Sequence, residues 1–109
     1  MMKVEAIIRP EKLAPVKTAL SEIGINGMTT YMVLGRGEQG GLEFTHRAGK
    51  YKVDLLEKMK IEIVVADSKA DAVVKAIIDS ARTGEVGDGK IFLTKIEKAI
   101  KVRTGEAED

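Results

Sequence analysis

The chain has 109 residues, of which 44% are hydrophobic and 32% are charged, and its formal net charge is +1 at pH 7. This length fits a single domain over residues 1–109, and such a balanced charge provides no field that would favour nucleic acid or an anionic membrane. The absence of cysteine excludes disulfides and thiol chemistry.

The N-terminal third is predicted to form a strand, a helix and a second strand. Residues 4–8 are an apolar run followed by Pro10, which is typical of a buried strand that ends near the proline. Apolar side chains then recur at steps of three and four over residues 12–23, which predicts a helix that Gly24 ends. Residues 28–34 are rich in strand-forming side chains and predict the second strand.

The second half of the chain repeats this order. Residues 60–66 alternate and then become fully apolar, which predicts a strand. Residues 67–81 carry one apolar stripe of helical spacing, with Asp67 or Ser68 expected to cap the start of the helix. Residues 91–94 predict a strand after it.

Two strand-helix-strand halves indicate an α+β protein of the ferredoxin-like, split βαβ arrangement. In this arrangement the helices cover only one face of the sheet. The sequence contains no third helix for the other face, so we expect a symmetric oligomer to cover it.

The two ends of the chain carry weaker signals. Residues 99–103 alternate and predict a short fifth strand, and residues 104–109 form a polar tail that we expect to be flexible. The charged N-terminus lacks the apolar core of a signal peptide, and no apolar run approaches transmembrane length. We therefore expect a cytoplasmic protein.

A long glycine-rich segment, residues 35–58, separates the second and third predicted strands. It shows no helical stripe, and a structureless loop of this length inside a small domain is usually functional or disordered. A dispensable surface insertion is the alternative.

Residues 83–90 form a second glycine-rich segment directly before a predicted strand. Gly84, Gly87 and Gly89 permit backbone angles that let several N–H groups converge on an anion, and Lys90 adds a positive charge. It is not a Walker A loop, because Ile91 stands where a hydroxyl residue is required. We expect valine at either of the last two glycines to abolish anion binding while the fold survives; the alternative is a tight connection without a ligand.

These segments give the chain a resemblance to the nitrogen regulatory PII signal-transduction proteins. Residues 83–93 match the signature of that family, and the similarity extends from residues 4–10 to residues 102–104. Residues 35–58 align with the T-loop of the family, on the matching residues Gly35, Arg36, Gly37, Gln39, Gly41, Arg47, Tyr51, Val53, Asp54 and Lys58.

The resemblance implies a homotrimer that binds ATP or ADP in three clefts between subunits. In the family, residues at the positions of Gly87, Asp88, Gly89 and Lys90 surround the phosphates, while Lys101 and Arg103 would approach from the neighbouring subunit. Thr29, Gly35, Gly37 and Val64 would line the adenine and ribose side of the site.

The resemblance also implies a site for 2-oxoglutarate and Mg²⁺. The side-chain oxygen of Gln39 would help to hold the metal ion, which ATP and 2-oxoglutarate also ligate. Lys58 would neutralise a carboxylate or a phosphate, and the N–H of Gly41 would complete the anion pocket. Without the family, a solvated amide at Gln39 and a surface cation at Lys58 are the alternatives.

By resemblance, the protein is a regulatory sensor rather than an enzyme. Its T-loops would dock onto targets in nitrogen assimilation, either an enzyme or an ammonium transporter, and Arg47 would contact a transporter. Tyr51 corresponds to a modification site in some relatives, although residues 48–50 change what a modifying enzyme would meet. Glu38 and Lys101 also depart from the arginines that are common in the family, which leaves the ATP/ADP preference open.

Three other functions remain open at this point. One is a PII-like trimer that binds nucleotide without responding to 2-oxoglutarate. Another is an enzyme, either a phosphotransferase or ATPase that uses Lys90 or a weak ATPase. The third is a trimer of the same fold, related to metal-tolerance proteins, that lacks these ligands.

Overall fold

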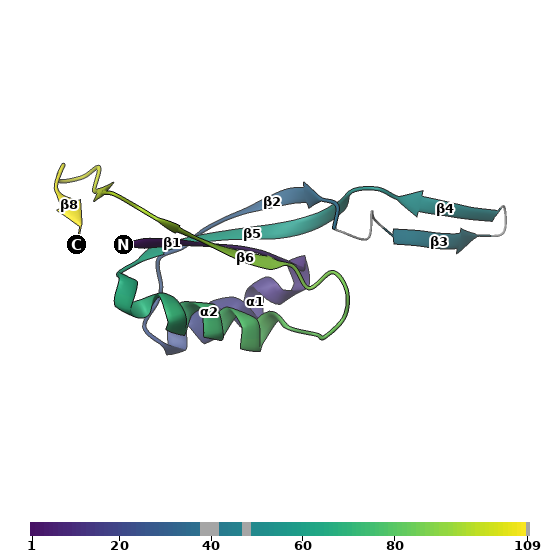
Figure 1. The fold of residues 1–109 in the computed structure, drawn as a ribbon, viewed down its shortest axis with the longest axis horizontal. Helices are drawn as coiled ribbons and strands as arrows, with labels where there is room; N and C mark the ends of the chain where they lie inside the picture. Colours follow the sequence, from purple (N-terminus) through teal and green to yellow (C-terminus); the bar gives the residue numbers. More distant parts are fainter. Residues whose placement is uncertain (38–41, 47–48, 109) are drawn as a thin grey trace.

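Two strand-helix-strand units form the body of the protein, as the order of elements in the sequence predicts (Figure 1). The computed structural model describes residues 1–37, 42–46 and 49–108. The first unit consists of β1 (Met2–Ile8), the 3₁₀ turn η1 (Pro10–Lys12), α1 (Leu13–Glu22) and β2 (Thr29–Gly35). The second consists of β5 (Leu56–Val65), α2 (Asp67–Ala81) and β6 (Lys90–Lys95).

The main sheet has the strand order β2-β5-β1-β6, and all its neighbouring strands are antiparallel. Val4 of β1 is opposite Ile63 of β5 on one side and Leu93 of β6 on the other. The first strand of each unit therefore lies in the centre of the sheet, and the second strand of each lies at an edge. This is the ferredoxin-like α+β architecture, and the predicted fold class is confirmed.

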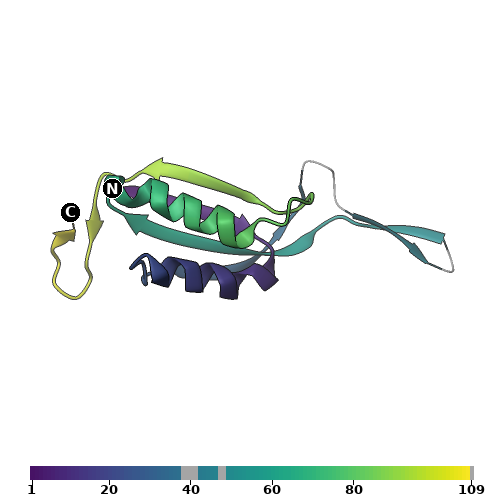
Figure 2. The same ribbon diagram turned by 90° about the horizontal axis from the view of Figure 1, so that it is seen from below.

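Both helices pack on the same face of this sheet, side by side (Figure 2). Val4, Ala6 and Ile8 of β1 are buried against them because alternate residues of a strand point to the same face. The helices contribute residues of the predicted stripes, among them Leu20 of α1 and Ile77 of α2. Each fully buried side chain of this size contributes about 1.5–3 kcal/mol to folding.

The helix ends follow the predicted pattern at one place and depart from it at another. Gly24 has φ +81°, and its N–H donates to the carbonyl of Ser21, which closes α1 as predicted. The predicted cap of α2 is wrong, because the helix has no side-chain cap. The Asp67 carboxylate instead pairs with the N-terminal amine at 3.1 Å and with Lys95 at 2.7 Å. In the part of the chain that the structure describes, no helix is long and apolar enough to cross a membrane.

The long segment between β2 and β5 contains a hairpin, so the prediction of a structureless loop is wrong for its described part. Strands β3 (Leu42–His46) and β4 (Gly49–Val53) pair with each other and extend away from the body (Figure 1). In addition, β5 begins at Leu56, four residues before its predicted start, because its first residues continue to pair with the end of β2.

The chain also ends in paired strands. The predicted fifth strand is only two residues long, β7 (Ala99–Ile100), and it pairs with β8 (Ala107–Glu108), which lies in the segment expected to be a flexible tail. This short hairpin and the β3–β4 hairpin lie at opposite ends of the molecule, whose long axis is 59 Å (Figure 1).

The face of the sheet opposite the helices carries charged side chains along its middle. Glu5 of β1 lies 3.1 Å from Lys3 and 3.7 Å from Lys60, and the Tyr31 hydroxyl is 3.1 Å from Glu62. No helix from the described residues covers this face (Figures 1 and 2). Its centre is therefore a polar network rather than an apolar patch.

Candidate functional site

A cavity of about 460 Å³ lies beside the start of β6 and the root of the β3–β4 hairpin. This volume is in the range of sites for small molecules and cofactors. Its lining comes from four strands, their ends and the glycine-rich turn before β6, and consists of Ile7, Arg9, Gly35, Arg36, Gly37, Leu56, Lys58, Glu85, Val86, Gly87, Asp88, Gly89, Lys90 and Phe92.

Half of this lining consists of residues that the sequence analysis predicted to bind ligands, namely Gly35, Gly37, Lys58, Gly87, Asp88, Gly89 and Lys90. The antiparallel register brings these distant segments together, because Ile7 is opposite Lys90 and Val33 is opposite Lys58. Gln39, Gly41 and Arg47 lie outside the described residues, and Tyr51 lies in β4. Their predicted roles therefore remain predictions.

Asp88 holds the glycine-rich turn in shape. Its carboxylate accepts hydrogen bonds from the backbone N–H groups of Thr83 at 2.9 Å and Gly84 at 2.8 Å, and another from the Thr83 hydroxyl. The Thr83 hydroxyl, followed by these N–H groups and Arg9, keeps the pKa of Asp88 well below its usual range. The carboxylate is therefore ionised at neutral pH and is occupied by its own loop.

Arg9 is a part of the site that the sequence analysis missed. Its Nε lies 3.3 Å from Asp88 Oδ1, and its Nη2 donates to the Val86 carbonyl at 2.8 Å. Arg9 follows β1 directly, and the turn directly precedes β6. The ferredoxin-like strand order, which makes β1 and β6 neighbours, was the signal that could have placed them together.

Two glycines of the turn have backbone angles that other residues avoid. Gly87 has φ +98° and Gly89 has φ +109°. A Cβ at Gly89 would lie 1.7 Å from the Ile7 carbonyl oxygen, so the backbone of the turn passes directly over β1. The expectation that Gly89 can be replaced without harm to the fold is therefore wrong.

Lys58 reaches across the cavity to the same turn. Its Nζ donates to the Gly87 carbonyl at 2.7 Å. Desolvation, followed by the charge of Arg9, lowers the pKa of Lys58. An anion in the cavity would offset both effects, because it would offer a counter-charge to the two cations.

The arrangement as a whole is suited to an anion with several charges. Arg9, Arg36, Lys58 and Lys90 bring four cationic groups to the lining, while Asp88 is already bound within the turn. Glycine backbone at the turn leaves N–H groups unobstructed by side chains. Phosphate groups fit these donors, since they accept charge-assisted hydrogen bonds from both backbone and cationic side chains.

The remaining residues of the predicted nucleotide site do not line this cavity. Val64 follows Lys58 by six positions along β5, which corresponds to roughly 20 Å in a strand. Thr29 is opposite Glu62 near the same end, and Lys101 and Arg103 lie in the connection between β7 and β8. Gly35 and Gly37 do line the cavity, so one copy of the chain divides the residues that were predicted on the adenine and ribose side.

A second hollow, about 410 Å³, lies over one helix only. Its lining consists of Lys17, Thr18, Ser21 and Glu22, all from α1. It has neither glycine backbone nor a convergence of cations from several elements, so the cavity beside β6 is the candidate site.

Comparison with known proteins agrees with this geometry. The family model described as nitrogen regulatory protein P-II matches residues 1–106. A protein named nitrogen regulatory protein P-II 2 from Methanothermobacter thermautotrophicus is 50% identical over 98% of this chain and 93% of its own length. Proteins named nitrogen regulatory protein P-II from Nostoc punctiforme and Haemophilus influenzae are 55% and 50% identical, each over 97% of this chain and 95% of the relative.

Proposed function

The chain belongs to the P-II family of nitrogen regulatory proteins, and on that premise we propose that it is a sensor of ATP, ADP and 2-oxoglutarate. One observation supports the proposal most directly. The glycine-rich turn, which the Asp88 carboxylate holds in shape, lines the same cavity as four cationic residues. Family membership supports a regulatory role.

The phosphates of a nucleotide are assigned to this cavity. The backbone of Gly87 and Gly89 would meet the phosphate oxygens, with Lys90 and Lys58 as counter-charges. Arg9 and Asp88 would keep the turn in the shape that binding requires. The volume, the glycine backbone and the cations all fit a nucleoside polyphosphate.

A complete site would need a second copy of the chain. Thr29, Val64, Lys101 and Arg103 would bring the adenine, the ribose and further phosphate contacts from a neighbouring subunit. The distance along β5 between Lys58 and Val64 within one copy supports this arrangement, because no side chain spans roughly 20 Å. A homotrimer with three such interfaces is the assembly that we propose, and it would also bury the open face of the sheet.

The response to 2-oxoglutarate is assigned to the root of the hairpin, beside the cavity. Gln39 would donate its amide oxygen to Mg²⁺, with Gly41 and Lys58 binding the oxoacid. Mg²⁺ would supply positive charge beside the phosphates and the oxoacid, and it favours oxygen ligands such as the Gln39 amide.

Calorimetric titration tests this proposal. We expect ATP and ADP each to bind the unliganded protein, and 2-oxoglutarate to bind only after ATP and Mg²⁺ are present. The coupling must be reciprocal, so 2-oxoglutarate should also tighten ATP binding. A Gln39→Leu variant is the control, because it should retain ATP binding and lose the coupling. Equal affinity for 2-oxoglutarate in the unliganded, ADP-loaded and ATP-Mg²⁺-loaded protein would refute the shared site.

The proposed output is docking on an ammonium transporter through the hairpin. We expect ADP-loaded protein to bind transporter-containing vesicles, and ATP, Mg²⁺ and 2-oxoglutarate together to release it. Arg47→Ala should weaken docking without changing ATP affinity, since Arg47 would insert its cation into the transporter exit. Co-sedimentation under each ligand condition measures this. Docking that is indifferent to all three effectors would contradict the proposed output.

A further inference from the structure

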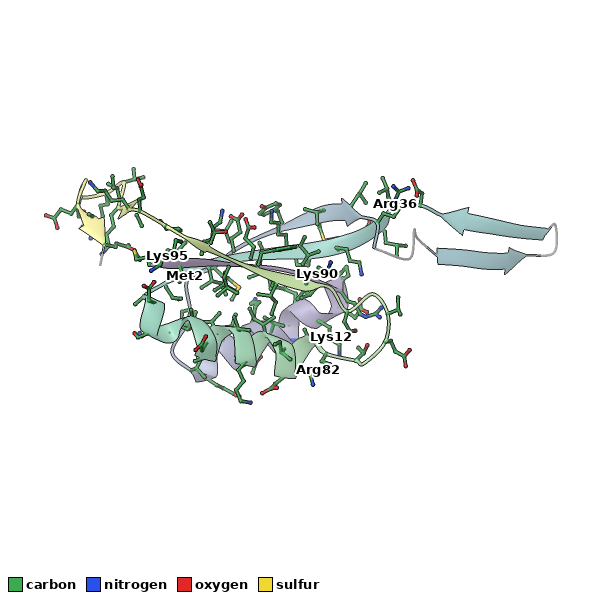
Figure 3. The ribbon with its side chains drawn as sticks, viewed as in Figure 1. Met2, Lys12, Arg36, Arg82, Lys90 and Lys95 are labelled. Atoms are coloured by element: carbon green, nitrogen blue, oxygen red, sulfur yellow. The ribbon has the colours of Figure 1, made fainter. Side chains whose placement is uncertain are left out.

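Arg36 connects the cavity to the hairpin. It directly follows Gly35, the last residue of β2, and its side chain lines the cavity together with Lys58 and Lys90. Figure 3 shows Arg36 at the root of the β3–β4 hairpin, while Lys90 lies over the body of the sheet. Arg36 thus supplies a cation at the hairpin end of the same cavity.

The partner of Arg36 lies on the opposite side of the hairpin root. Arg36 Nη1 lies 3.0 Å from Asp54 Oδ1, and Asp54 belongs to the short connection between β4 and β5. Both side chains are more than half exposed, at 57% and 63%. Exposed ion pairs of this kind are weak because water screens the charges. This contact can therefore be exchanged at little cost.

The other cations of the cavity are held differently. Arg9 is bound to Asp88 and to the Val86 carbonyl, and Lys58 is bound to the Gly87 carbonyl. Both are thereby fixed against the glycine-rich turn. Arg36 is oriented instead by Asp54, in the connection between β4 and β5, so its position depends on that segment.

We propose that Arg36 leaves Asp54 to bind the most distal phosphate of a bound nucleotide. An arginine forms paired, charge-assisted hydrogen bonds with a phosphate, and these are stronger than a solvent-screened ion pair. The exchange frees Asp54 and removes a side-chain contact between the two sides of the hairpin root, beside the pairing of Gly35 with Leu56. The number of phosphates is then reported to the hairpin. This inference rests on the proposed function, since it names a phosphate ligand within the same site.

Isothermal titration of ATP and ADP into matched variants tests the exchange. Arg36→Gln should weaken ATP binding by about tenfold and ADP binding little, because a charge-assisted contact to the distal phosphate is lost. Asp54→Asn should strengthen ATP binding by roughly twofold to fivefold, since Arg36 no longer has to leave an ion pair. Arg82→Gln is the control, as Arg82 is an exposed arginine that does not line the cavity and should change neither affinity.

The opposite changes in ATP affinity expected for Arg36→Gln and Asp54→Asn distinguish phosphate binding by Arg36 from a purely structural role of the ion pair. If the ion pair merely supported the hairpin root, Arg36→Gln and Asp54→Asn would weaken ATP binding alike, and that result would overturn the inference. Unchanged ATP affinity in Arg36→Gln, or an equal loss for ATP and ADP, would also overturn it while leaving the proposed function intact. If the unaltered chain bound neither nucleotide, the proposed function and this inference would fail together.

Discussion

Gly89→Ala should lower the free energy of unfolding by more than about 3 kcal/mol, because it combines backbone strain with a clash that nothing can relieve. Gly89 has φ +109°, and the added Cβ would lie 1.7 Å from the Ile7 carbonyl oxygen and 2.8 Å from the Ile7 carbonyl carbon. These are backbone atoms of a central strand, so they cannot move without disrupting the sheet. Urea denaturation measures the loss, and nucleotide binding should disappear with it.

Two other glycines separate the clash from the strain. Gly84 has φ +89° with nothing within 4 Å of its added Cβ, so Gly84→Ala should cost only about 1–2 kcal/mol. Gly27 also has open space but needs no positive φ, so alanine there should be neutral or slightly stabilising. A loss at Gly89 no larger than that at Gly84 would show that the turn does not pass so close to β1.

Gly87 should behave in a third way. Its added Cβ would lie 3.3 Å from Nη2 of Arg9, the far end of a flexible side chain that can shift. The fold should therefore survive Gly87→Ala, while the contact between Arg9 and the Val86 carbonyl is disturbed. The original expectation of lost binding with an intact fold thus applies to Gly87 rather than to Gly89.

Asp88→Ala should weaken ATP binding by about tenfold or more, although it removes a negative charge from an anion site. The carboxylate accepts hydrogen bonds from the N–H groups of Thr83 and Gly84 and pairs with the guanidinium of Arg9. Without it, ATP would have to order the turn on binding, and the entropy cost of that ordering would lower the ATP affinity. Titration of ATP into the variant measures the loss, and a circular dichroism spectrum should show that the sheet and helices remain.

Glu85→Ala is the matched control for this experiment. Glu85 lines the same cavity, and it also carries a negative charge. Its removal should leave ATP affinity unchanged or raise it, because repulsion of the phosphates falls. The change in ATP affinity should therefore have opposite signs in the two variants. Stronger ATP binding by Asp88→Ala would refute the role of Asp88 in holding the turn in shape.

The pH dependence of the Asp88 contacts with the turn follows from the same hydrogen bonds. Hydrogen bonds keep the pKa of Asp88 in the folded protein well below its usual range. A carboxyl group whose pKa is lower in the folded state stabilises that state. The stabilisation is complete at pH values above the pKa of the unfolded chain, about 3.9, and it is lost as the pH falls from there through the lower pKa of the folded state. The difference in ATP affinity between the unaltered chain and Asp88→Ala should therefore persist at pH 5.

The sequence by itself determined the elements whose burial repeats regularly. The apolar stripes of α1 and α2 and the alternation in β1 and β5 are local consequences of one face packing on a core, so their periods can be read without a partner. Gly24 likewise closes α1 through its own backbone angle. Two strand-helix-strand halves then led to the correct fold class, and the glycine turn that the sequence singled out lies in the lining of the cavity.

The tertiary structure alone decided the features that depend on pairing between distant segments. Strand β5 continues back to Leu56 because β2 pairs with it there, and β3 and β4 form a hairpin because they pair with each other. Arg9 joins the site because β1 and β6 are neighbours, and Val64 is excluded from the cavity because it lies far along β5. Periodicity indicates which face of an element is buried. The position of a side chain relative to a distant segment also depends on which strands become neighbours, and the tertiary fold decides this.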